Sequence, residues 1–213
     1  TSSGYIMVLK HDSDGISDED MWKQLQKEYK DKYDMSWIGQ YGFNNTYALI
    51  VREEAAKKYN LTKTSQLANV SNELVFGGNS DYIERKDGFH LLCDTYGLKF
   101  KDVKDIDIGL KYEALKKGDI DVSNGFTTDA QLSNDNVRVL EDDKHLQVNY
   151  FCSNVVRNDT LKSHPGLEEA IMKLDNSITD KEMASLNYKV EVEGKEDVEV
   201  AKDYLTEKGI IKQ

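Results

Sequence analysis

Apolar residues in this chain recur first at helical spacing and then in short strand-like runs, and the two patterns alternate from end to end. Ser17 can cap a helix whose third position is Asp20. The apolar face of that helix is predicted to hold Trp22, Leu25, Tyr29 and Tyr33. Such alternation predicts an α/β fold with largely parallel sheets.

The remaining elements follow from the same patterns. Strands are predicted over residues 35–38, 47–51, 74–76, 106–108, 120–122, 137–140 and 149–156. Further helices are predicted over residues 53–59, 84–96, 112–117, 167–174 and 200–208. Pro165 is the single proline and no flexible linker is visible, so two lobes would be joined by strands that run from one to the other. An apolar stretch over residues 5–9 opens the chain with no strand before it, which favours an α/β lobe that lacks its first part.

Composition and charge exclude some classes of function. With 213 residues, 38% hydrophobic and 31% charged, the chain can form one large domain or two lobes of a soluble protein. The formal charge of −11, with lysines dispersed among acids, argues against nucleic acid. No apolar run reaches the roughly 18 residues of a membrane span. The opening Thr1-Ser2-Ser3-Gly4 carries neither an initiator Met nor a signal peptide, so we expect a mature chain or a piece of a longer one.

Catalytic and metal-binding motifs are missing from the sequence. The four histidines include no pair at helical spacing, and there is no GxSxG, P-loop or GxGxxG motif. The segment 77–80, Gly-Gly-Asn-Ser, could cradle an anion at a helix start, although an ordinary turn fits it better. Cys93 and Cys152 lack zinc-type spacing; a disulfide is open to them, but we expect two buried thiols. The chain is therefore predicted to be a binding protein without metal or cofactor, and not an enzyme.

Four segments carry candidate binding residues. Residues 42–51 run from a glycine through Asn44, Asn45 and Thr46 to Tyr47 at the mouth of a strand. The other three segments are 81–88, 125–129 and 149–152. Arg85 is predicted at a helix start, where the helix dipole disfavours a cation. This position indicates either a separate role or a surface arginine paired with Glu84 or Asp87, and the two interpretations fit equally well. In α/β proteins ligands gather at the carboxyl ends of strands, so rings from these segments could form one cage.

Several motifs together resemble a known family. GFNNTYAL, ERKDG, IDIGLKYEALKKGDIDV, FTTD, VLEDDKH and LNYKVEVEGK occur in the order typical of substrate-binding proteins of ABC importers for glycine betaine, carnitine and choline. The resemblance implies a two-lobed, periplasmic-binding-protein-like fold of type II (a venus flytrap), with a ligand cage between the lobes. Lobe I is expected to comprise residues 1–46 and 153–213, and lobe II residues 47–152.

The resemblance also implies the binding residues. Tyr47, Phe126 and Tyr150 match aromatic cage positions, and Asn45 a neighbour of the ligand's ammonium group. Arg85 matches the family arginine that contacts the ligand carboxylate. Ser2 or Ser3 matches a position whose hydroxyl assists that arginine.

Three features depart from the family pattern. A Tyr-Thr-Gly that usually precedes this point, with a cage tyrosine, is absent, so we expect the first lobe to be incomplete. Family members tend to have Pro-Pro-Tyr-Tyr where this chain has Val148-Asn149-Tyr150-Phe151, and often Tyr or Trp at Phe126.

The resemblance predicts an extracytoplasmic receptor that passes a quaternary ammonium solute such as choline, glycine betaine or carnitine to an ABC permease subunit in the membrane. The location would be a cell-surface lipoprotein, a permease-fused domain or the periplasm. The alternatives are a receptor for another trimethylammonium betaine such as ergothioneine, an enzyme acting on a small cationic substrate, and a folded fragment that no longer binds.

Overall fold

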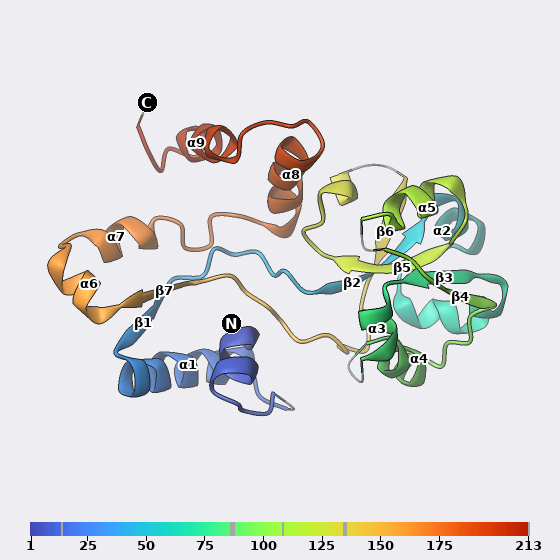
Figure 1. Cartoon of the computed structure of the whole chain (residues 1–213), viewed down its shortest axis with the longest axis horizontal. Helices are drawn as coiled ribbons and strands as arrows, with labels where there is room; N and C mark the ends of the chain where they lie inside the picture. Colours follow the sequence, from blue (N-terminus) through green and yellow to red (C-terminus); the bar gives the residue numbers. More distant parts are fainter. Residues whose placement is uncertain (14, 86–87, 108, 134–135, 213) are drawn as a thin grey trace. The chain divides into compact units, whose positions relative to one another are not determined.

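The computed structural model describes residues 1–13, 15–85, 88–107, 109–133 and 136–212. Within them the chain divides into two compact units. Unit 1 comprises residues 1–46 and 148–213, and unit 2 residues 47–147. Each unit mixes helices and strands, so the fold is α/β (Figure 1). The lobe limits expected from the sequence, with a boundary at residue 152 instead of 147, stay a prediction.

Unit 1 is built on a two-stranded antiparallel sheet. Strand β1 (Met35–Ile38) pairs with β7 (Asn154–Arg157), and Met35 faces Arg157. Helix α1 (Asp18–Tyr33) packs on this sheet, and Ser17 caps it by accepting the backbone N–H of Asp20 at 3.1 Å, as predicted. The apolar core beneath α1 is formed by Tyr5, Leu9, Met21, Leu25, Tyr29 and Trp37.

The rest of unit 1 is helical. The opening apolar stretch forms a π-helix, η1 (Ser3–Val8), that contributes Tyr5 to the core. After β7 the chain forms α6 (Asn158–Ser163), α7 (Leu167–Met172), α8 (Asp180–Glu191) and α9 (Asp197–Glu207). Helix α8 was not predicted, although its start carries a clear signal: Thr179 and Glu182 form a capping box.

Unit 2 contains a five-stranded mixed sheet in the order β4-β3-β5-β2-β6. The strands are β2 (Tyr47–Arg52), β3 (Val75–Gly78), β4 (Asp102–Asp105), β5 (Val122–Phe126) and β6 (Val137–Leu140). Strand β3 is parallel to β4 and β5, whereas β2 is antiparallel to β5 and β6. The expectation of largely parallel sheets was wrong for the two-stranded sheet of β1 and β7 and for β2. No crossover helix within unit 2 precedes β2, so this strand is not forced to be parallel.

Both faces of this sheet are covered, which explains the uninterrupted apolar run 48–51. Leu49 and Val51 point to one face, where they pack with Phe76 and the helices α2 (Glu53–Tyr59) and α4 (Phe89–Tyr96). Ile50 points to the other face, against Leu115 of α5 (Lys111–Lys117). A strand buried on both sides has apolar residues at consecutive positions.

Four predicted elements were placed wrongly. The strand expected over 120–122 shares only its last residue with β5, which runs from Val122 to Phe126. The helix expected over 84–96 is two helices, α3 (Ser80–Glu84) and α4, with Gly88 as the N-cap of α4; Lys86 and Asp87 lie outside the described residues. The strand expected over 106–108 is observed earlier in the chain, as β4, which ends at Asp105. Ile108 also lies outside the described residues. The strand expected over 149–156 is shortened to β7, because residues 148–151 pair with 44–46 only through single bonds and one bridge.

Cys93 and Cys152 are free thiols, each half-buried instead of fully buried. Burial raises the pKa of the Cys93 thiol to about 11.

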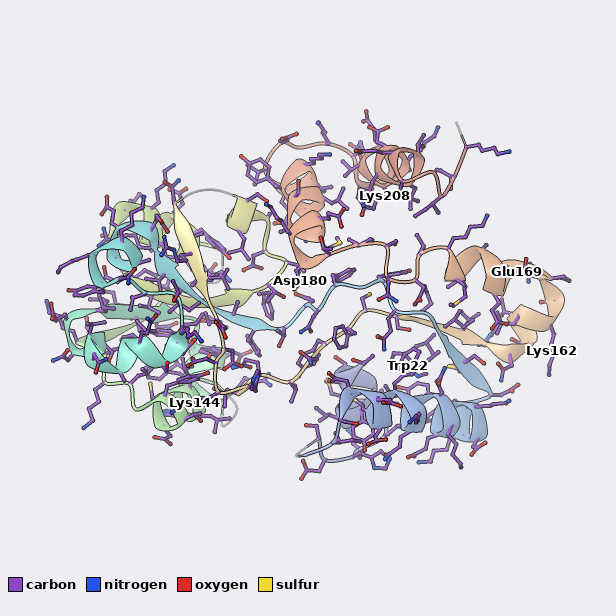
Figure 2. All side chains as sticks on the ribbon, turned by 180° about the vertical axis from the view of Figure 1, so that it is seen from behind. Trp22, Lys144, Lys162, Glu169, Asp180 and Lys208 are labelled. Atoms are coloured by element: carbon purple, nitrogen blue, oxygen red, sulfur yellow. The ribbon has the colours of Figure 1, made fainter. Side chains whose placement is uncertain are left out.

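The basic residues are dispersed over several elements, as the sequence analysis expected. Examples are Lys162 of α6, Lys144 in the loop after β6 and Lys208 at the end of α9 (Figure 2). None of the described helices has the length and apolar character that a membrane span requires.

Phe76 is fully buried at the centre of the unit 2 core, with its ring centroid 4.7 Å from that of Phe89 and 5.2 Å from that of Phe100. We expect Phe76→Ala to lower the free energy of unfolding by about 3–5 kcal/mol through the cavity it leaves. Val198→Ala, at a site 74% exposed, is the control and is expected to stay within about 0.5 kcal/mol. Urea unfolding followed by circular dichroism measures both, and equal effects would contradict the assigned core.

Candidate ligand-binding residues

The two units hold different parts of the predicted site. Tyr47, Phe126 and Arg85 belong to unit 2, whereas Tyr150 and Asn45 belong to unit 1. Ser2 and Ser3, at the start of the chain, also belong to unit 1. The two groups are described separately below.

In unit 2 the sheet register brings Tyr47 and Phe126 together. Tyr47 opens β2 and lies directly opposite Phe126, the last residue of β5, in the antiparallel ladder. Directly opposed side chains project from the same face of a sheet. Their rings are accordingly stacked, with centroids 5.0 Å apart and planes 25° apart. Two rings separated by almost eighty positions in the sequence thus form one half-buried aromatic surface.

A third ring, which the sequence analysis did not assign to the site, supports this pair. Tyr82 of α3 lies with its ring centroid 5.4 Å from that of Tyr47 and 6.3 Å from that of Phe76. Tyr82 is 4% exposed, so it links the hydrophobic core to the half-buried Tyr47. The sequence signal was its place just after strand β3, at the carboxyl end where ligands gather in α/β folds.

Arg85 lies at the opposite end of a helix from the one predicted. It is the C-cap of α3, and its backbone N–H donates to the carbonyl of Asp81 at 3.1 Å. A cation at a helix C-terminus is electrostatically favoured. The dipole argument for a special role of Arg85 is therefore wrong, while its exposed side chain leaves the expected carboxylate contact as a prediction.

In unit 1 the candidate residues lie on two segments that run side by side, 44–46 and 148–151. Asn44, which the sequence analysis placed in the candidate segment without assigning it a role, bonds to both neighbours on the other segment. Its Oδ1 accepts the backbone N–H of Tyr150 at 2.6 Å, and its Nδ2 donates to Asn149 Oδ1 at 2.6 Å. The backbone N–H of Asn45 donates to the carbonyl of Tyr150 at 3.2 Å. Tyr150 is therefore held at both its backbone N–H and its backbone carbonyl. The two consecutive asparagines of the motif were the sequence signal for this arrangement.

Asn149 stands where the family resemblance led us to expect proline, and its side chain has contacts that proline could not provide. Besides its bond to Asn44, Asn149 Nδ2 donates to Asp18 Oδ2 at 2.7 Å. The Ser2 hydroxyl donates to the Asn149 carbonyl, and Ser2 is fully buried. Ser3 is exposed on η1. The expected contact of Ser2 or Ser3 with a ligand carboxylate stays a prediction, and in the structure the Ser2 hydroxyl bonds to the 148–151 segment.

The proposed anion cradle at 77–80 has the wrong charge. A hollow beside it is lined by Asn79, Ser80, Asp81, Asp105, Ile106 and Asp107. The Ser80 hydroxyl donates to Asp105 Oδ2 at 2.7 Å. Three carboxylates disfavour a phosphate or another anion, which agrees with the preferred interpretation of this segment as an ordinary turn.

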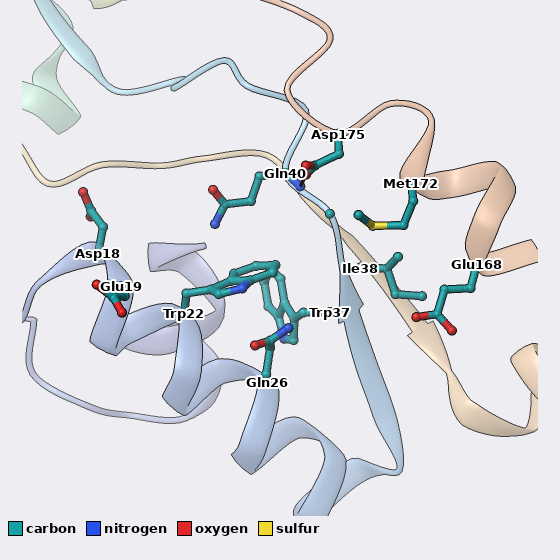
Figure 3. A pocket seen from close by; sticks show the side chains of 11 residues that line it. Asp18, Glu19, Trp22, Gln26, Trp37, Ile38, Gln40, Glu168, Met172 and Asp175 are labelled. Atoms are coloured by element: carbon teal, nitrogen blue, oxygen red, sulfur yellow. Dashed lines mark hydrogen bonds between the residues drawn. The ribbon is translucent and has the colours of Figure 1, made fainter. Parts of the chain in front are cut away.

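A second hollow, of about 460 Å³, lies wholly in unit 1 (Figure 3). Trp22 and Trp37 lie next to each other in it, with ring centroids 6.1 Å apart. Its acidic lining residues are Asp18, Glu19, Glu168 and Asp175. The indole N–H of Trp37 is buried and has no hydrogen-bond partner among the described residues. None of the residues predicted to bind the ligand lines this hollow.

Comparison with known proteins agrees with this architecture. A solved structure titled "Crystal structure of glycine betaine/carnitine/choline ABC transporter" matches with a TM-score of 0.90 and 35% identity, over 98% of this chain and 76% of that one. The fold is therefore the two-lobed fold of periplasmic binding proteins. The family described as "Substrate binding domain of ABC-type glycine betaine transport system" matches residues 4–207, and the chain belongs to this family.

Two curated relatives are similar over most of the chain. The ergothioneine transport permease/ergothioneine binding protein EgtU of Helicobacter pylori (strain G27) is 35% identical over 99% of this chain and 37% of its own length. The carnitine transport binding protein OpuCC of Listeria monocytogenes (strain 10403S) is 37% identical over 85% of this chain and 59% of its own length. This chain thus spans between about a third and three fifths of the length of these relatives.

Asn44 offers a direct test of the unit 1 segment pair. We expect Asn44→Ala to lower the free energy of unfolding by about 1–3 kcal/mol, because the Tyr150 N–H loses its acceptor. Hydrogen exchange at the Tyr150 amide should accelerate in this variant. Asn72→Ala, at an exposed position of unit 2, should leave that exchange rate unchanged; acceleration in both variants would mean that Asn44 does not hold Tyr150.

Proposed function

We propose that this chain is the solute-binding part of an ABC importer and that its ligand is a zwitterion with a trimethylammonium head group, such as glycine betaine, carnitine or ergothioneine. Membership in the glycine betaine substrate-binding family supports the transport role. The two relatives described above, named for ergothioneine and for carnitine, support the ligand class, since both compounds combine such a head group with a carboxylate. The proposed partner is a membrane permease, and the proposed location is outside the cytoplasm.

The observation that carries the ligand class is the stacked pair of Tyr47 and Phe126. A quaternary ammonium group has no N–H to donate, so a protein must hold it by aromatic faces and apolar contact. Each ring contributes about 0.5–1 kcal/mol when exposed and about 2 kcal/mol when desolvated. Three or four rings would supply most of a micromolar affinity, roughly 8 kcal/mol.

The residues that match the family's binding positions would each have a separate role. Tyr47, Phe126 and Tyr150 would be the rings of an aromatic cage. Asn45 would lie next to the ammonium group, and Arg85 would bind the carboxylate through paired hydrogen bonds. Choline, the second candidate ligand, lacks this carboxylate and would gain nothing from Arg85.

Titration calorimetry with glycine betaine, carnitine, ergothioneine and choline tests the proposed function. We expect saturable binding of at least one of these compounds. Tyr47→Ala and Tyr150→Ala are each expected to weaken binding about 5- to 30-fold, the loss of one partly or fully desolvated ring.

Tyr47→Phe keeps the ring and serves as the matched control, with affinity expected within a few-fold of the unaltered protein. Val198→Ala controls for handling, as it lies on exposed surface. Unchanged affinity in both alanine variants would show that the cage is assigned to the wrong residues. Binding of none of the four compounds would contradict the ligand class itself.

Arg85 provides a second test, which separates the two ends of the ligand. We expect Arg85→Ala to weaken binding of a betaine about tenfold or more, because a charge-assisted bidentate contact is lost. Choline affinity should not change, so the ratio of the two affinities reports the carboxylate contact. Equal losses for both ligands would remove this role from Arg85.

A further inference from the structure

A carboxylate next to Phe126 accepts hydrogen bonds from three different groups. Asp129 Oδ2 lies 3.0 Å from Lys111 Nζ, 2.6 Å from the Tyr112 hydroxyl and 3.1 Å from the backbone N–H of Phe126. The backbone N–H of Asp129 in turn donates to the carbonyl of Phe126 at 3.0 Å. Asp129 therefore bonds to both the backbone N–H and the backbone carbonyl of Phe126, in the turn that follows β5.

The charges in this cluster are withdrawn from water. Lys111 is 5% exposed, and the side chain of Asp129 is 20% exposed. A buried ammonium is tolerated when it is paired, and Asp129 is the partner. Lys111 is also the first residue of α5, where the helix dipole disfavours a cation. Local helix energetics thus do not account for this lysine, whereas the contact with Asp129 does.

The cluster adjoins the aromatic pair of unit 2. Lys111 Nζ lies 5.8 Å from the centroid of the Phe126 ring and 5.1 Å from that of Tyr112, distances at which a cation is attracted to a ring. Phe126 is the same ring that stacks on Tyr47 at 5.0 Å. Displacement of the ammonium or of the turn would therefore act on the ring pair.

Gly125 makes room for this arrangement. A Cβ at this position would lie 2.9 Å from Asp129 Oδ2, 3.1 Å from the Tyr112 hydroxyl and 2.1 Å from Cδ1 of Ile50. The carboxylate and the hydroxyl therefore occupy space that any side chain at position 125 would need. A glycine within a strand often marks such a close approach.

We propose that Lys111, Tyr112 and Asp129 are positioning residues that fix the Phe126 ring against Tyr47 and so set the affinity for the ammonium head group. The proposal rests on the proposed function and adds three residues to it. Asp129 anchors the backbone of Phe126, Tyr112 orients the Asp129 carboxylate, and Lys111 neutralises that carboxylate while contacting the Phe126 ring.

Fluorine NMR of the ligand-free protein tests the ring position directly. The phenylalanines are labelled as 4-fluorophenylalanine, and the Phe126 signal is assigned by its loss in Phe126→Leu. We expect Asp129→Asn to shift or broaden the Phe126 signal and to weaken binding of the tightest of the four compounds above by about tenfold, comparable to the loss of one ring. Lys111→Arg, which keeps the charge, should retain most of the affinity.

The double variant Lys111→Met with Asp129→Asn tests the role of charge pairing. Because it leaves no unpaired charge, we expect it to bind more tightly than Asp129→Asn alone, and an additive loss would contradict the pairing. Tyr112→Phe removes only the hydroxyl and preserves the ion pair. It should move the Phe126 signal less than Asp129→Asn does, and it provides the same test if Asp129→Asn does not fold.

Arg138→Met is the matched control, since it breaks another ion pair on the same sheet, that of Arg138 Nη2 with Glu53 Oε1 at 2.6 Å. It should lower the melting temperature without moving the Phe126 signal or the affinity. The proposal would be overturned if Asp129→Asn behaved as Arg138→Met does. If the unaltered protein bound none of the compounds while Asp129→Asn still moved the signal, the proposed function would fail and the positioning of the ring would stand.

Discussion

The arrangement of unit 2 depends on the register between β2 and β5. Antiparallel pairing places Tyr47 opposite Phe126, and the pairs that follow, from Ala48 with Gly125 to Val51 with Val122, continue the same ladder. A slip of one residue would send each side chain to the other face of the sheet. The stacked rings and the buried Leu49 and Val51 therefore depend on one alignment, so that aromatic surface and core are specified together.

Burial of both sheet faces makes this alignment costly to change. Ile50, Val51 and Val122 are fully buried, with Ile50 in a different apolar cluster from the two valines. A register shift would exchange their partners and open cavities on both faces. Tyr82 extends the same core to Tyr47, so the half-buried ring rests on a rigid support.

Unit 1 holds its candidate residues by polar contacts instead. Segments 44–46 and 148–151 lie side by side with few regular ladder bonds, and side-chain amides supply the missing hydrogen bonds. Asn44 bonds to the backbone of Tyr150 and to the side chain of Asn149, and its own backbone N–H donates to Asp180 Oδ1 at 2.7 Å. Such a network is directional, and it fixes the backbone of Tyr150 without requiring its ring to be buried.

The sequence by itself determined the family and those local elements that carry a clear cap or an uninterrupted apolar run. The cap at Ser17 and the uninterrupted apolar run 48–51 each depend on neighbours in the chain, and they correctly predicted α1 and β2. The ordered motifs indicated the substrate-binding family, which the comparisons confirm. Tertiary structure alone decided the antiparallel direction of β2, the stacking of Tyr47 on Phe126 and the contact of Lys111 with Asp129. These depend on strand partners and on buried charges brought together from distant positions, and local spacing carries no record of which strands pair.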